Sequence, residues 1–195
     1  AVETLGCTTV ICTDKTGTLT VNQMTARAFT AGGRSYAVSG EGYGRAGSIA
    51  RDDDDGGAPT KAELEPLALA CALCNDASLR GGRAVGDPTE LALLVLARKT
   101  GLDLEAARGR FPRLAEIPFE SERRFMATVH GDGDRARVVV KGAPDVVLGR
   151  CAAVQLGEGE GDEPLSDASR AALARRGEEM AARGLRVLAL AARRV

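Results

Sequence analysis

The sequence predicts an α+β fold in which an antiparallel sheet is flanked by helices, preceded by one strand of an incomplete doubly wound domain. Strand-like and helix-like segments occur in blocks rather than in strict alternation, which is typical of α+β domains. The first segment differs, because a β-branched run over residues 8–13 ends at an acid in a Gly/Thr loop. Doubly wound domains present sites at strand ends in this way, but the partner strands are not found here. We therefore divide the chain into residues 1–23 and residues 24–195.

Short-range signals predict the elements that follow. Two strand-like runs between residues 24 and 38 flank Ala-Gly-Gly, which indicates a hairpin. Residues 40–59 are rich in glycine and aspartate, and we expect an exposed loop. Thr60-Lys-Ala-Glu63 is a capping box that begins a helix running to about residue 79. Asp87-Pro-Thr-Glu90 begins a second helix, with proline at its first position, that runs to Lys99 and stops at Gly101.

The second half of the chain predicts three strands in succession and then mixed elements. The strands cover residues 113–118, 125–130 and 135–141, and a Gly-Asp-Gly-Asp turn joins the last two. A short helix over 144–150, a Gly/Glu loop, a helix over 167–183 that ends at Gly184, and a strand over 185–191 complete the prediction.

Composition excludes several classes of protein. The chain has 195 residues, of which 44% are hydrophobic and 27% charged, as in ordinary globular domains. The net charge of −1 does not support nucleic-acid binding through an excess of basic residues. No apolar run approaches the ~18–20 residues that span a bilayer. The chain begins Ala-Val-Glu without an initiator methionine, so we expect a piece of a longer protein. We also expect this piece to be soluble and monomeric.

Cysteine and histidine do not predict a metal site. Cys71 and Cys74 lie in an apolar helical stretch without a second pair nearby, which favours buried structural thiols. His130 is the only histidine and ends an apolar strand, so a structural role is expected for it as well.

The run Asp14-Lys15-Thr16-Gly17-Thr18 carries the clearest chemistry. An aspartate that attacks phosphorus becomes an acyl-phosphate, so a metal ion and an ammonium are needed to balance the negative groups. Threonine hydroxyls and loop amides can donate to the phosphoryl oxygens, and glycine lets the backbone approach closely. A helix cap or a turn would explain one Asp or Thr but not the five-residue run, which predicts phosphoryl transfer to Asp14.

At these residues the chain resembles the P-type ATPases, whose phosphorylation motif is Asp-Lys-Thr-Gly-Thr, and residues 1–24 are similar to the calcium-pump branch of that family. Further motifs follow in the family's order: Cys74-Asn75-Asp76, Gly86–Glu90, Phe119–Arg124, Lys141–Pro144 and Leu185–Leu190. The resemblance implies the nucleotide-binding domain of such a pump, preceded by a segment of its phosphorylation domain and hinge. The parent would use ATP to drive cation transport from the cytoplasmic face of a membrane, with calcium as the leading candidate.

The resemblance implies a role for each residue of the first motif. Asp14 would be phosphorylated, and its carboxylate and the Thr16 carbonyl would bind Mg²⁺. Lys15 would balance charge, and Thr16 would also help to hold the transferred phosphoryl group.

The resemblance also implies a pocket for ATP or ADP. Phe119 would stack on adenine, Lys141 would line the base pocket, and Gly142 would let the base approach the backbone. Glu90 would lie at the edge of the pocket. Two alternatives stay open, because Phe119 could be a core aromatic and Glu90, as the third residue of a helix, could serve as a cap.

The phosphate contacts are less defined. Some animal calcium pumps have an arginine two residues after the stacking phenylalanine, where Ser121 stands here. Contact would then come from Arg123, Arg124 or Arg186, among which the sequence does not decide, and we take Arg124 and Arg186 as candidates. Arg123 could equally be a solvated surface charge.

Two other functions deserve comparison with this hypothesis. A haloacid-dehalogenase-type phosphatase or phosphotransferase shares the aspartate nucleophile but needs a second acid two residues on, where Thr16 stands. A nucleotide-binding module with an inactive Asp14 loop is disfavoured by the intact motif. The favoured hypothesis predicts that the isolated chain binds ATP and ADP without turnover, because the rest of the phosphorylation domain, the actuator domain and the transmembrane domain are its partners in the parent.

Overall fold

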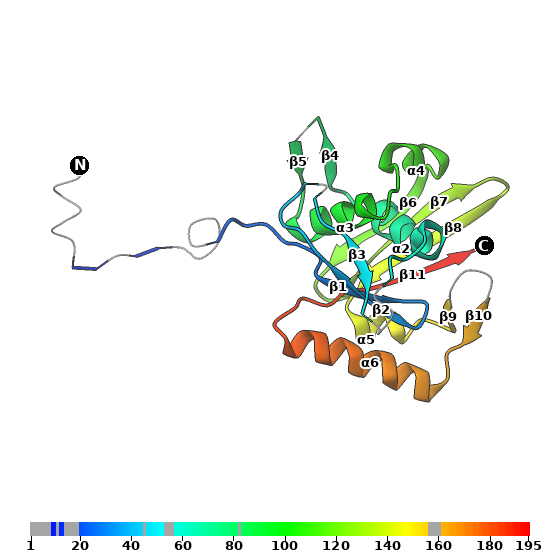
Figure 1. Cartoon of the computed structure of the whole chain (residues 1–195). Coiled ribbons are helices and arrows are strands. Elements are labelled where there is room, and N and C mark those ends of the chain that lie inside the picture. Colours follow the sequence, from blue (N-terminus) through cyan, green and yellow to red (C-terminus); the bar gives the residue numbers. More distant parts are fainter. Residues whose placement is uncertain are drawn as a thin grey trace.

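The computed structural model describes residues 9–10, 12–13, 20–44, 46–52, 57–81, 83–155 and 161–195. At its centre is a four-stranded sheet in the order β11-β8-β7-β6. Figure 1 shows α2, α3 and α4 on one side of this sheet and α5 and α6 on the other. All strand pairings between the described elements are antiparallel, so the predicted α+β class is confirmed.

A small sheet precedes the first helix. It comprises β1 (Ala28–Ala31), β2 (Arg34–Val38) and β3 (Ile49–Arg51). The predicted hairpin is confirmed, and both residues of its turn, Gly32 and Gly33, have the positive φ that such tight turns require. The strand β3 lies inside the segment that we expected to be loop, because a run of three residues is too short to show a period of two.

Local capping sets the start of the first two long helices, as predicted. In α2 (Lys61–Leu73), the Thr60 hydroxyl and the Glu63 carboxylate form the reciprocal bonds of a capping box. In α3 (Pro88–Lys99), the Asp87 carboxylate accepts from the amide of Thr89 at 2.7 Å.

The end of α2 was predicted too late. The helix ends at Leu73 rather than near residue 79, and the chain then forms the hairpin of β4 (Ser78–Arg80) and β5 (Arg83–Val85). The short helix α4 (Leu104–Arg110) was not predicted either. Its N-cap residue, Asp103, accepts hydrogen bonds from two backbone amides. Ala107 is the one buried residue of the helix, so its sequence has no apolar stripe from which a helix could be predicted.

The strands of the central sheet are β6 (Arg113–Glu120), β7 (Phe125–Asp132), β8 (Arg135–Gly142) and β11 (Ala189–Arg194). The first three confirm the prediction, while β11 begins at Ala189 rather than at residue 185. Met126 of β7 pairs with Lys141 of β8, and Thr128 pairs with Val139. Met126 and Val139 pack against Leu69 and Leu73 of α2, which makes this the face that α2 covers.

The other face carries the remaining elements. They are α5 (Pro144–Leu148), the hairpin of β9 (Ala153–Gln155) and β10 (Asp162–Pro164), and α6 (Asp167–Ala182). Both predicted helices are confirmed, and α6 is followed by Gly184 with a φ of +79°. The hairpin lies in the segment that we expected to be a loop.

The strand predicted over residues 8–13 is not confirmed. Of these residues the structure describes Thr9, Val10, Cys12 and Thr13, and none of the four is in a strand. Val10 is exposed, and the described residues offer no neighbouring strand on which a strand here could complete its hydrogen bonds. No helix within the described ranges has the length and apolar character needed to cross a membrane.

Candidate functional site

The antiparallel register gathers five predicted site residues at one end of the central sheet. Phe119 is next to last in β6, Arg124 precedes β7, and Lys141 and Gly142 end β8. Gly142 pairs with Phe125, the first residue of β7, and also with Ala189, the first residue of β11. Arg186, shortly before Ala189, therefore lies near the same end.

Glu90 joins this group through an ion pair. Its Oε1 lies 2.5 Å from Nζ of Lys141, and the two side chains are 15% and 9% exposed. A charge-assisted hydrogen bond this far withdrawn from water holds the ammonium in one place. The capping alternative for Glu90 is not what the structure shows, because Asp87 caps α3 and the Glu90 carboxylate bonds elsewhere.

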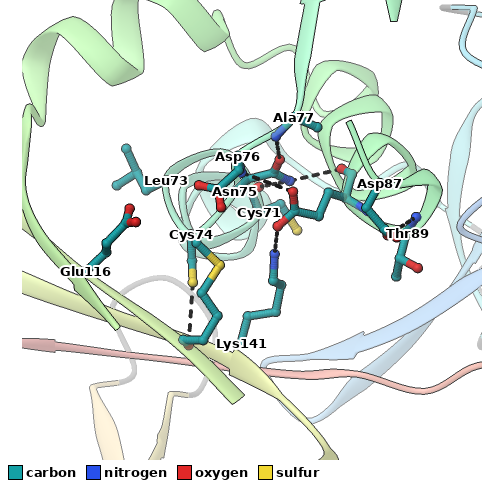
Figure 2. Close-up of polar contacts among 12 residues, drawn as sticks. Cys71, Leu73, Cys74, Asn75, Asp76, Ala77, Asp87, Thr89, Glu116 and Lys141 are labelled. Carbon is teal, nitrogen blue, oxygen red and sulfur yellow. Dashed lines mark hydrogen bonds and ion pairs between the residues drawn. The ribbon is translucent and has the colours of Figure 1, made fainter. Parts of the chain in front are cut away.

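The turn that follows α2, residues 75–77, also holds Glu90, and Figure 2 shows Asn75, Asp76 and Ala77 above Lys141. Asn75 is 2% exposed, and its Nδ2 donates to the carbonyls of Cys71 at 3.1 Å and Glu90 at 2.9 Å. Its Oδ1 accepts from the amide of Ala77 at 2.9 Å. The amide of Asp76 donates to Glu90 Oε2 at 3.1 Å. Sequence reasoning included Asn75 and Asp76 in a motif, but nothing in the spacing indicated that they contact Glu90.

Two arginines cap the carboxyl end of α2 and the same turn. Arg108 donates to the carbonyls of Ala72, Asn75 and Ala77 at 3.1–3.2 Å. Arg113 donates to the carbonyls of Leu73 and Asn75, and it pairs with the carboxylates of Asp76 and Glu116 at 2.6 and 2.7 Å. Cations suit this position because the last carbonyls of a helix are unpaired and carry partial negative charge. Sequence reasoning identified neither arginine.

Gly142 is required by packing inside the protein. A Cβ on this residue would lie 2.5 Å from the carbonyl oxygen of Arg124 and 2.6 Å from Cβ of Phe125. The Arg124 carbonyl also accepts from the amide of Ala143 at 2.9 Å, so it is not free to move away. We expected glycine at position 142 so that a base could approach the backbone. The structure adds a second reason, which is the close packing of residue 142 against Arg124 and Phe125.

Phe119 is 56% exposed, which excludes the alternative that it is a core residue. Its neighbour Ile117 is also exposed. An aromatic face open at a strand end is available for stacking by a flat ligand.

The three arginines differ in what they already contact. Arg124 pairs with Asp145 at 2.7 Å, and this hydrogen bond lowers the pKa of the Asp145 carboxyl. Arg123 pairs with Glu120 at 2.6 Å. Arg186 is exposed, and no hydrogen bond or ion pair joins it to another residue of the described ranges.

Asp14, Lys15 and Thr16 lie outside the described residues, so their predicted roles in catalysis and magnesium binding stay predictions. Within the described ranges, no cluster of three or more His, Cys, Asp or Glu side chains is suited to a metal ion.

The thiols of Cys71 and Cys74 and the imidazole of His130, which lies toward the other end of β7, are buried. Burial raises the pKa of Cys71 to about 12 and also raises that of Cys74, although the charge of Lys141 opposes both shifts. Burial lowers the pKa of His130, whose ring nitrogens contact the Phe111 carbonyl and the Thr128 hydroxyl at 3.0 and 2.9 Å. A buried thiol that stays protonated is a poor nucleophile, and the structural interpretation of these residues holds.

Comparison with known proteins identifies relatives along the whole chain. The chain is 44% identical to the cation-transporting ATPase pma1 of Synechocystis, over 100% of this chain and 22% of that protein. It is 41% identical to the calcium-transporting ATPase of Bacillus subtilis, over 77% of this chain and 17% of that protein. Identity to the human calcium-transporting ATPase type 2C member 1 is 40%, over 97% of this chain and 21% of that protein.

The chain therefore spans about a fifth of the length of the curated relatives that it matches. Residues 63–195 match the family model of the P-type ATPase cytoplasmic domain N. This match covers more than half of the chain, includes all the residues gathered at this end of the sheet, and agrees with the relatives. The chain belongs to the P-type ATPase family, as part of its cytoplasmic domain N.

Proposed function

We propose that this chain is the ATP-binding domain of a cation-transporting P-type ATPase that is phosphorylated at Asp14. One observation carries the proposal: the ammonium of Lys141, fixed by Glu90, and the exposed ring of Phe119 belong to the same end of the sheet. An exposed aromatic face suits stacking by a purine, and a fixed ammonium can donate to its ring nitrogens. ATP and ADP share the base, so both should bind.

The phosphates of such a ligand need a cationic partner. Arg123 and Arg124 are already paired with carboxylates, whereas Arg186 is exposed and makes no such pair among the described residues. A guanidinium binds phosphate through two parallel hydrogen bonds. Arg186 therefore fits this role best, and Arg124 would have to leave Asp145 to share it.

The phosphorylation step belongs to the first segment. Asp14 and Thr16 offer carboxylate and carbonyl oxygens, the donor type that Mg²⁺ takes, and Lys15 offers an ammonium. Magnesium, when bound, would neutralise charge on the phosphoryl oxygens. Relatives named cation- and calcium-transporting ATPases support cation transport by the parent, with calcium first, and a cytoplasmic position for this domain.

Calorimetric titration of the 195-residue chain with ATP and ADP tests nucleotide binding. We expect dissociation constants of roughly 10 μM to 1 mM for both, because a single domain contacts mainly one end of the ligand. Phe119→Ala should weaken both about 5- to 100-fold, corresponding to the loss of one base–aromatic stack. Its thermal midpoint should stay nearly unchanged, since the ring is exposed.

Leu114→Ala is the matched control, because Leu114 is an exposed apolar residue near the other end of β6. Its affinity for ATP should equal that of the wild type. Absence of ATP binding at millimolar concentrations, or equal affinity losses in the two variants, would refute the proposed function.

A further inference from the structure

We propose that Asn75 is a positioning residue of the nucleotide site: it fixes Glu90 and thereby sets where the ammonium of Lys141 points. The inference rests on the proposed nucleotide binding at Lys141. It adds a residue that does not itself touch the nucleotide and that acts through two others.

The side chain of Asn75 joins three segments of the chain. It donates to the last turn of α2 at Cys71 and to the first turn of α3 at Glu90, and it accepts from Ala77 in the turn between them. Both donated bonds and the accepted one are made inside the protein, at 2% exposure. A buried amide with donors and acceptor satisfied in this way has a single orientation. The spacing between the end of α2 and the start of α3 is therefore set at this residue.

The Glu90 carboxylate then receives one partner on each oxygen. Oε2 accepts from the amide of Asp76, the residue directly after Asn75, and Oε1 contacts Nζ of Lys141. A lysine has four rotatable side-chain bonds, and fixing it in one geometry needs a partner that is itself fixed. Figure 2 shows Asn75 and Asp76 above Lys141, on the side from which these contacts reach its ammonium.

The other groups at the turn do not reach the carboxylate. Arg108 and Arg113 contact backbone carbonyls of α2 and the turn, and Arg113 adds ion pairs to Asp76 and Glu116, but neither contacts Glu90. The path from Asn75 through Glu90 to Lys141 is thus separable from the general stability of the turn.

A double-mutant cycle tests this path. Asn75→Asp keeps the shape and the acceptor but loses both N–H donors, and Asn75→Ser is the second variant if the first does not fold. Each is made alone and together with Glu90→Gln. Calorimetry gives the affinity for ATP, and NMR of ¹⁵N-labelled lysine gives the Nζ resonance of Lys141 without nucleotide; the chain has only four lysines to assign.

We expect either Asn75 variant to weaken ATP binding about 3- to 10-fold and to shift the Lys141 Nζ resonance toward that of an exposed lysine. In the Glu90→Gln background, the same Asn75 substitution should weaken ATP binding by less than about 2-fold, because the effects of substitutions at residues that act through one another are not additive. Tyr36→Phe is the control: it removes a buried hydrogen bond to Glu63 at the other end of α2, so it should lower stability without moving the Lys141 resonance or the affinity.

A folded Asn75 variant with an unchanged Lys141 resonance would overturn the proposal, as would a loss of affinity that persists in full without the Glu90 carboxylate. A wild-type chain that does not bind ATP would refute the proposed function instead. The Lys141 Nζ resonance would still test whether Asn75 positions Lys141 through Glu90. A shift of this resonance in the Asn75 variants would support that proposal, and an unchanged resonance would overturn it.

Discussion

Lys141→Met replaces the ammonium with an uncharged side chain of similar length, and the Glu90 carboxylate then loses its counter-ion. One hydrogen bond remains to it, from the amide of Asp76 at 3.1 Å. Leaving a buried charge uncompensated costs about 3–5 kcal/mol. The carboxylate keeps 15% of its exposure, so we expect the low end, a loss of about 3 kcal/mol in the free energy of unfolding. Glu90→Gln leaves the Lys141 ammonium without its counter-ion instead, and it should lower the free energy of unfolding by a similar amount.

The double variant Glu90→Gln/Lys141→Met removes both charges. It should be more stable than the sum of the two single losses predicts, by about 2 kcal/mol or more, because no isolated charge is left. Urea unfolding followed by circular dichroism, with linear extrapolation to water, measures all four proteins.

The pair of Arg80 and Glu105 is the matched control. Its atoms lie 2.8 Å apart, but the side chains are 68% and 62% exposed. Arg80→Met should therefore cost less than about 1 kcal/mol. If the Lys141 and Glu90 variants lose no more than this control, or if their losses simply add, then the pair is hydrated in solution and our account of the site's electrostatics is wrong.

The remaining predictions concern pH, packing and chemistry. Burial lowers the pKa of His130 below its ordinary value of 6.5, so its contribution to stability is complete above pH 6.5 and is lost as the pH falls below that; His130→Gln should flatten the urea-measured stability over this window. Tyr36→Phe removes the hydroxyl that donates to Glu63 and should lower the free energy of unfolding by about 1 kcal/mol in the same assay. Gly142→Ala should cost about 1–3 kcal/mol and weaken ATP binding in calorimetry, since the new methyl meets backbone rather than a flexible side chain. With γ-labelled ATP and magnesium, the isolated chain should acquire no hydroxylamine-sensitive label, because it spans only about a fifth of the length of the relatives that are named ATPases.

Three of these predictions have a direct contrary outcome. An unchanged pH profile in His130→Gln would mean that the imidazole has the same pKa in the folded and unfolded protein. A neutral Gly142→Ala would show that the turn between β6 and β7 relaxes freely. Stoichiometric label that disappears in Asp14→Asn would mean that the phosphorylation site is self-contained within this chain.

The sequence predicted best what local chemistry determines. The caps Thr60 and Asp87 place the starts of α2 and α3 correctly, because each needs only hydrogen bonds within one turn. The strands β6, β7 and β8 were found because each has eight residues and a strand-like composition. For Phe119 the sequence left a core position open, and the structure decided for an exposed one.

What could not be predicted depends on contacts between distant residues. Lys141 and Glu90 are 51 residues apart in the sequence, and the residues around each give no indication that the two side chains form a pair. The contacts of Asn75 and Arg113 depend on how α2, α3 and β6 pack against one another, which the sequence alone does not give. Short elements such as β3 and α4 were missed because they owe their form to packing rather than to their own propensity.

The strand order has a consequence for how this domain matures on the ribosome. The strand that carries Lys141, β8, lies between β7 and β11, yet β11 is the last element of the described chain, and Leu190 is the residue that pairs with Lys141. Until residues 189–194 leave the exit tunnel, one edge of β8 has unpaired amides and carbonyls and is a template for wrong pairing. A nascent chain that already contains the helices of the described ranges therefore still has an open edge on β8 beside Lys141, and the pairing of β11 closes that edge.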